Sequence, residues 1–347
     1  LDQTRVANQR YTENTKALGE RLGLEENALS GITETLNRVR ERALQGNGGT
    51  LGDSDRASIA ADLRQSLDGL LDYANAADGE GRYLFAGSND ANAPFSLSSG
   101  GTQFSGDDVI RQVQIGPNRV VQSSDGGSEV FLRQVSGNGT FSVAATAANT
   151  GTATIATAKV FDAAAWDGGS YNLSFAGGNY SVQDGGGNVV ASGAYTAGQS
   201  IRFKGADLTV TGAPADGDSF SIGASQQQDI FQTVRDLITL FETPTSSNPV
   251  TRAKVQTGVL DKLGALETAQ SRVIDVRARL GSRLVAADDA QNQLSSQLVK
   301  IDEALSGIRD IDYAEAASRL TQQLTGLQAA QQSFAKIQGL SLFSYLR

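Results

Sequence analysis

The C-terminal third of the chain carries one long run of apolar residues at helical spacing, and this run most limits what the chain can fold into. It contains no proline, so nothing interrupts a helix from about residue 252 to residue 308. Such a helix would be on the order of 85 Å long at ~1.5 Å per residue. A compact domain does not need a rod of that length, so the sequence predicts an elongated bundle or coiled coil. The positions on alternating three- and four-residue steps are Val259, Leu263, Leu266, Gln270, Val273, Arg277, Leu280, Leu284, Ala287, Gln291, Leu294, Leu298, Ile301, Leu305 and Ile308.

Three polar side chains, Gln270, Arg277 and Gln291, occupy positions of this seam. Polar residues at such positions lower stability but can fix the register of the packed helices. They can equally be solvated where the packing is loose, and the sequence does not choose between these interpretations.

The N-terminal third contains a second seam that can pack against this rod. Its spacing predicts a helix that is stopped by the Gly-Asn-Gly-Gly run at 46–49, with Glu25 as its one polar member. A second helix follows, capped by Asp53 or Ser54, and ends at residues 78–81. The apolar positions of the two helices are Leu18, Leu22, Leu29, Ile32, Leu36, Val39 and Ala43, then Ala60, Leu63, Leu67, Leu70, Ala74 and Ala77.

The two outer thirds therefore predict one antiparallel helical bundle built from both ends of the chain. The expected fold is α+β and multidomain, an elongated bundle or coiled coil with an inserted all-β domain. The expected parts are residues 1–88 and 226–309 for the rod, 89–225 for the insert and 310–347 for a terminal assembly helix. The expected core of the rod is Leu22, Leu29, Ile32, Leu36, Val39, Leu63, Leu67, Leu70, Leu263, Leu266, Val273, Leu280, Leu284, Leu294, Leu298 and Ile301.

The middle third differs in composition from both ends. Most of the 39 glycines lie between residues 89 and 225, where short runs alternate polar and apolar residues. Runs such as 171–175 and 180–182, separated by Gly-Gly and Asp-Gly, are typical of antiparallel hairpins. Residues 136–223 should form a compact β module, and residues 85–135 should form strands that lead to it.

Composition excludes several classes of function. The chain has no histidine and no cysteine, which excludes histidine-dependent triads, thiol nucleophiles and most metal sites, so we expect no cofactor, no metal and no enzyme. The net charge is −9 and no third is basic, which argues against nucleic-acid binding, and no apolar run is long enough to span a membrane. The Asp-Gly turns are too poor in ligands for calcium. Since methionine is absent, we expect Leu1 not to be the natural start of the chain.

The last segment has an amphipathic stripe with almost no charge. From residue 316 onward the charged residues are Arg319, Lys336 and Arg347. The segment could dock on its own monomer, lie on a membrane surface, or become ordered against a partner subunit. The polar face lacks the cations that membrane-surface helices use. The stripe consists of Ala317, Leu320, Leu324, Leu327, Gln331, Phe334 and Ile337.

Several sequence blocks, in the same order along the chain, resemble bacterial flagellins and their junction relatives. They are Leu-Asn-Arg-Val-Arg-Glu-Arg-Ala-Leu-Gln at 36–45, Asp-Ser-Asp-Arg at 53–56, Arg-Ala-Arg-Leu-Gly-Ser-Arg-Leu at 277–284 and Asp-Tyr-Ala-Glu at 312–315. The block Gly-Arg-Tyr-Leu-Phe-Ala-Gly at 81–87 is similar to the signature of the hook-associated protein 3 branch, the hook–filament junction proteins. The β insert resembles modules of other hook-associated proteins.

This resemblance implies a structural adaptor of the extracellular flagellum, exported unfolded by the flagellar type III system without a cleaved signal. The implied partners are further copies in a ring, the first junction protein, flagellin or the filament cap, and an export chaperone. The alternatives are a flagellin filament subunit and a carbohydrate-binding surface protein that acts through the β insert. The expected assembly interface is Leu320, Leu324, Leu327, Phe334, Ile337, Leu342 and Phe343.

Overall fold

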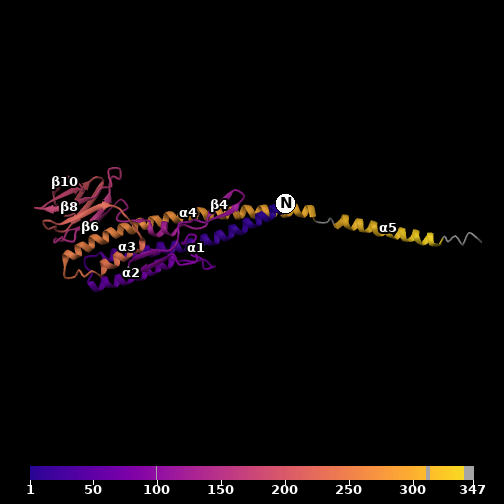
Figure 1. Cartoon of the computed structure of the whole chain (residues 1–347), viewed down its shortest axis with the longest axis horizontal. Helices are drawn as coiled ribbons and strands as arrows, with labels where there is room; N and C mark the ends of the chain where they lie inside the picture. The colour runs from indigo at the N-terminus through magenta and orange to yellow at the C-terminus, as the bar shows by residue number, and fades with distance from the viewer. Residues whose placement is uncertain (99, 310–312, 340–347) are drawn as a thin grey trace, which may run out of the picture. The chain divides into compact units, whose positions relative to one another are not determined.

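The computed structural model describes residues 1–98, 100–309 and 313–339. Long helices come from both ends of the chain, and a β-rich region is inserted between them, which confirms the predicted fold class (Figure 1). The helices are α1 (Asp2–Gly46), α2 (Asp53–Ala74), α3 (Ile230–Glu242), α4 (Pro249–Arg309) and α5 (Tyr313–Gly339), with a short π-helical turn η1 (Ser128–Leu132). Two compact units are present: residues 14–290, and residues 1–13 with the described residues from 291 onward.

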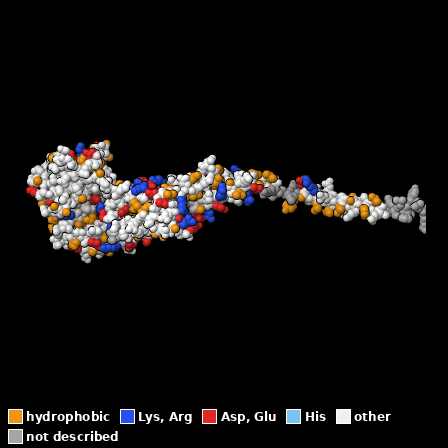
Figure 2. All heavy atoms as spheres, viewed as in Figure 1, with side chains coloured by type: hydrophobic (Ala, Val, Ile, Leu, Met, Phe, Trp, Pro, Cys, Tyr) orange, Lys and Arg blue, Asp and Glu red, His pale blue; other side chains and the backbone are white. Residues whose placement is uncertain are grey.

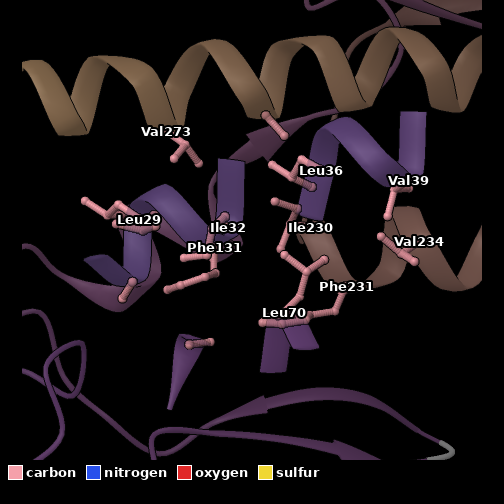
Figure 3. Packing of buried hydrophobic residues seen from close by; sticks show 14 of the residues in the cluster. Leu29, Ile32, Leu36, Val39, Leu70, Phe131, Ile230, Phe231, Val234 and Val273 are labelled. Atoms are coloured by element: carbon pink, nitrogen blue, oxygen red, sulfur yellow. The ribbon is translucent and has the colours of Figure 1, made fainter. Parts of the chain in front are cut away.

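The larger unit is built around a bundle in which α1 and α4 run antiparallel. Side chains at the three- and four-residue spacing of α1 meet those of α2, α3 and α4 in one apolar core (Figure 3). Leu22, Leu29, Ile32, Leu36, Val39, Leu63, Leu67, Leu70, Leu266, Val273 and Leu280 are buried there, while Leu263 and Leu284 are half-buried against the same cluster. Two polar seam residues also contact α1: Gln270 Nε2 donates to Asn37 Oδ1 at 2.9 Å and Arg277 Nε to Glu26 Oε1 at 3.0 Å.

The smaller unit pairs the first residues of α1 with the last turns of α4. Asn8 Nδ2 donates to Gln297 Oε1 at 3.2 Å, and Arg5 forms an ion pair with Asp302 at 2.8 Å. In this unit Leu294 is buried and Leu298 and Ile301 are half-buried. The seam residue Gln291 keeps a buried Oε1 that has no hydrogen-bond partner among the described residues.

The start of α2 corrects one prediction, because neither Asp53 nor Ser54 is its cap. Gly52 occupies the cap position, and Asp55 Oδ2 accepts a hydrogen bond from the Gly52 amide at 3.2 Å. Asp53 is already helical, and its carboxylate accepts instead from the amides of Thr245 at 2.8 Å and Ser246 at 3.1 Å. The carboxylate satisfies the turn after α3, a role that sequence spacing alone does not indicate.

The β module has a core of its own. The module contains a five-stranded antiparallel sheet in the order β10-β9-β8-β13-β6 and a three-stranded sheet in the order β11-β12-β7. Residues of both sheets contribute to the same apolar cluster. Alternate residues of β8, Tyr171, Leu173 and Phe175, are buried, and Leu173 pairs with Val182 on one side and Phe220 on the other. The strands are β6 (Phe141–Ala145), β7 (Thr154–Val160), β8 (Tyr171–Ala176), β9 (Asn179–Asp184), β10 (Val189–Ala194), β11 (Ser200–Phe203), β12 (Ala206–Thr211) and β13 (Ser219–Ala224).

The segment before the module packs on the bundle. Phe85, Phe95 and Phe131 meet Phe231 of α3 in an aromatic cluster, with ring centroids 5.0–5.7 Å apart for the pairs Phe95–Phe131, Phe85–Phe131 and Phe131–Phe231. This segment contains two hairpins, and the chain enters and leaves the module through a two-stranded neck. The remaining strands are β1 (Phe95–Ser98), β2 (Gly101–Phe104), β3 (Gln112–Gly116), β4 (Arg119–Gln122), and the neck strands β5 (Gln134–Val135) and β14 (Gln227–Gln228).

Candidate assembly surfaces

Among the residues that the structure describes, helix α5 presents the largest regular set of exposed apolar side chains. Exposed hydrophobic side chains follow its length (Figure 2). The exposed fractions are 57% for Leu320, 52% for Leu324, 56% for Leu327, 62% for Phe334 and 68% for Ile337. The other two members of the predicted interface, Leu342 and Phe343, lie outside the described residues.

The sequence of α5 explains why these side chains share a face. Steps of four, three and seven residues from Leu320 to Leu324, Leu327 and Phe334 keep each side chain on one side of a helix with 3.6 residues per turn. The polar face carries little net charge, because the positive charge of Arg319 is paired with the negative charge of Glu315 at 2.7 Å. A face of leucine and phenylalanine has no group for bond-making chemistry, but it can pack against another helix.

A second surface joins the β module to α4, and sequence reasoning missed it. Lys254 Nζ donates to the Ala147 carbonyl at 2.6 Å, and Thr257 Oγ1 accepts from the Ile155 amide at 3.2 Å. Asp261 Oδ1 accepts from the Val143 amide at 3.0 Å, and burial raises the pKa of this carboxyl. These hydrogen bonds satisfy backbone groups of β6, β7 and the turn after β6 with side chains from α4.

The residues of this docking face did carry a signal in the sequence. Lys254, Thr257, Asp261 and Gly264 are separated by three, four and three residues, the same spacing as the apolar seam. Gly264 lies so close to the module that a Cβ atom there would be 2.7 Å from the Gly137 carbonyl oxygen. Within this stripe Gly264 is the residue that indicates a close neighbour, because the polar face of a helix is otherwise ordinarily solvated.

Neither a membrane-spanning helix nor an acidic metal cluster is present in residues 1–98, 100–309 and 313–339. None of the helices in these ranges is long and apolar enough to cross a membrane. In the same part of the chain, no group of three or more aspartate or glutamate side chains is placed to hold a metal ion.

The chain matches three known regions of flagellar proteins. Residues 2–90 match the bacterial flagellin N-terminal helical region and residues 263–346 the C-terminal helical region. Residues 144–224 match the D2-like domain of flagellar hook-associated protein 1, which confirms that the insert resembles a module of another hook-associated protein.

Whole proteins and solved structures give the same assignment. Flagellar hook-associated protein 3 of Escherichia coli is 25% identical over 344 residues, covering 99% of this chain and 83% of that protein. The crystal structure of FlgL from Xanthomonas campestris has a TM-score of 0.83 and 37% identity, covering 88% of this chain and 100% of that one. For hook-associated protein 3 of Legionella pneumophila the TM-score is 0.84 and the identity 31%, covering 90% and 98%. The chain therefore belongs to the flagellar hook-associated protein 3 (FlgL) family, whose members are structural proteins of the flagellum and not enzymes.

Proposed function

We propose that this chain is an adaptor that joins the flagellar hook to the filament, and that the apolar face of α5 is the surface by which it assembles. The observation that carries the proposal is that face, exposed on a helix with almost no charge, in a chain of the hook-associated protein 3 family. A relative from Legionella pneumophila with 32% identity is described as a flagellar junction protein. The chain would act outside the cell, after export by the flagellar type III system.

The proposed partners follow from this position. Copies of the chain would form a ring, with the first junction protein on one side and flagellin or the filament cap on the other, and a chaperone would hold the chain before export. Covering the half-exposed side chains of α5 would contribute on the order of 5 kcal/mol per helix, at roughly 1.5–3 kcal/mol for each leucine-sized side chain buried completely. That stabilisation is large enough to order a helix against a neighbour.

In the proposed domain organisation, residues 1–88 and 226–309 form the rod, residues 89–225 form the insert and residues 310–347 form the assembly segment. Separate apolar clusters support the division between the bundle and the compact module of residues 136–223, whereas Phe95 and Phe131 of the preceding segment belong to the cluster of the bundle. Residues 136–223 expressed alone should give a β-type circular dichroism spectrum and a cooperative thermal transition. A random-coil spectrum would show that residues 136–223 do not fold independently.

The assembly role can be tested with charge substitutions on the two faces of α5. Leu324→Asp with Leu327→Asp should leave the circular dichroism of the monomer nearly intact but abolish swimming in a motile host, because each carboxylate would be buried unpaired in the joint. Gln322→Asp with Ala329→Asp adds the same charge to the opposite face and should preserve swimming.

Immunoblots of the culture medium separate failed export from failed assembly. We expect both double variants to reach the medium, and only the first to lose attached filaments. Normal swimming by the Leu324→Asp, Leu327→Asp strain would disprove the assembly role of this face.

A further inference from the structure

Glu25, the one polar residue of the α1 seam, is completely buried between Leu22 and Leu29. Its Oε1 accepts a hydrogen bond from the Asp125 amide at 2.9 Å. Its Oε2 is also buried and has no hydrogen-bond partner among the described residues. The carboxylate of Asp125 is paired with Arg283 of α4, and both of these side chains are largely buried. One guanidinium therefore pairs with the carboxylate of Asp125, while the nearby carboxyl of Glu25 has no cationic partner of its own among the described residues.

This arrangement favours a neutral Glu25. Burial, and next the negative charge of Asp125, raise the pKa of Glu25 well above its ordinary value of 4.5. A proton on Glu25 would let this carboxyl donate to the Asp125 carboxylate, which leaves one neutral ion pair, Asp125 with Arg283. Charged residues near it on α1, η1 and α4 have partners elsewhere: Arg21 with Asp78, Glu26 with Arg277, and Glu129 with Arg272 and Arg279.

The segment that Glu25 holds is part of the bundle core. Asp125 lies just before η1, in which Val130 and Phe131 are completely buried. Phe131 packs on Phe231 of α3 and on Phe85. Asp108 also holds this part of the chain, because its carboxylate pairs with both Ser128 and Arg133. Residues 123–132 therefore form a strap, fastened near its start by Glu25 and Arg283 and near its end by the phenylalanine cluster.

We propose that Glu25 is a proton-binding site that fastens this strap: the strap is held while Glu25 is protonated and loosens when Glu25 ionises. Ionisation would leave two buried negative charges near one arginine. The repulsion between the two carboxylates would weaken the contact between Asp125 and α1. The site would act within the folded subunit, so the proposal does not depend on the role of α5.

The first test is the pH dependence of unfolding of the full chain. Because the pKa of Glu25 is higher in the folded than in the unfolded chain, the stabilisation contributed by its bound proton is complete below pH 4.5. This contribution is lost as the pH rises toward the folded-state pKa of Glu25. Over that window the unfolding equilibrium constant of the wild type should rise by up to about tenfold per pH unit relative to that of Glu25→Gln, because one more proton is bound in the folded state. Glu26→Gln, which changes the adjacent residue, should follow the wild-type profile.

A second measurement identifies the proton directly. In a pH series above 4.5, the infrared difference spectrum between wild type and Glu25→Gln should contain the C=O band of a protonated carboxyl, and this band should disappear as the pH is raised further. Asp125→Asn removes the competing carboxylate and should move the loss of the band to lower pH. If the Glu25→Gln chain does not fold, a high-pH-minus-low-pH spectrum of the wild type over the same series serves instead. Identical pH profiles for wild type and Glu25→Gln, or the absence of the band, would overturn the proposal.

Discussion

The docking of the β module on α4 can be tested at Gly264, where the backbone of the helix lies close to a turn of the module. An alanine Cβ at this position would lie 2.7 Å from the carbonyl oxygen of Gly137 and 2.9 Å from its carbonyl carbon. Both are backbone atoms of a turn that is itself fixed, since Asn138 Oδ1 accepts from the amides of Thr140 and Phe141. The turn cannot rotate away as a flexible side chain could, so Gly264→Ala should push the module off the helix.

The expected magnitude follows from a matched pair of substitutions. Replacing glycine by alanine inside a helix stabilises it by up to about 1 kcal/mol, and inserting a methyl group into a packed contact typically costs about 1–3 kcal/mol. Gly281 lies in the same helix, and a Cβ atom added there would meet nothing within 4 Å. Gly281→Ala should therefore show the propensity gain alone. The free energy of unfolding of Gly264→Ala should be about 1–3 kcal/mol lower than that of Gly281→Ala, because the propensity gain is common to both.

Urea unfolding of the full chain measures the difference. Fluorescence of Trp166, the single tryptophan, reports on the β module, and circular dichroism reports mainly on the helices. We expect the tryptophan transition of Gly264→Ala to shift to lower urea relative to that of Gly281→Ala. Equal stabilisation by the two substitutions would refute the close approach and, with it, the rigid docking of the module.

Three further predictions concern other buried or paired groups. Arg56 donates to the Leu240 carbonyl at 2.8 Å from a buried position, so Arg56→Lys, which lacks the planar fork, should lower the free energy of unfolding by about 1–3 kcal/mol in urea titrations. Hydrogen bonds, chiefly from the Thr245 amide, lower the pKa of Asp53, so their stabilisation is present above 3.8 and is lost as pH falls; Asp53→Asn should flatten the acid limb of the stability profile. Burial and an adjacent aspartate raise the pKa of Tyr171 to about 12, and Tyr171→Phe should remove one late step from the ultraviolet tyrosine titration.

The bundle could be predicted from the sequence because burial in a helix has a period that the sequence must repeat. Leu29, Ile32 and Leu36 of α1 and Val273 of α4 follow that period, and all four are buried. The same holds for β8, where Tyr171, Leu173 and Phe175 alternate with exposed or half-buried residues. In both cases each residue indicates its own burial through its type, and no knowledge of its partner is needed.

The polar contacts could not be predicted, because their partners are distant in the chain. Asp261 accepts from an amide 118 residues away and Glu25 from one 100 residues away. An aspartate or glutamate on a helix is solvated in most proteins, and its type does not indicate which backbone group it will satisfy. The cap of α2 was wrongly predicted for the same reason: Asp53 is of the correct residue type for a cap, but its carboxylate binds an amide of a distant turn.

Position relative to an apolar seam nevertheless carries information that residue type lacks. A carboxyl inside a seam, such as Glu25, must lose its hydration when the helices pack, so a sequence that keeps it there implies a compensating partner or a bound proton. The polar stripe of Lys254, Thr257 and Asp261 carries no such implication by itself, because the polar face of a helix is ordinarily solvated; Gly264 in the same stripe is the residue that leaves room for a second body. In α4 the docking stripe lies ~180° around the axis from the apolar seam, on the opposite side of the helix. One uninterrupted helix can thus hold the bundle with one face and position the β module with the opposite face, which explains why no proline breaks it.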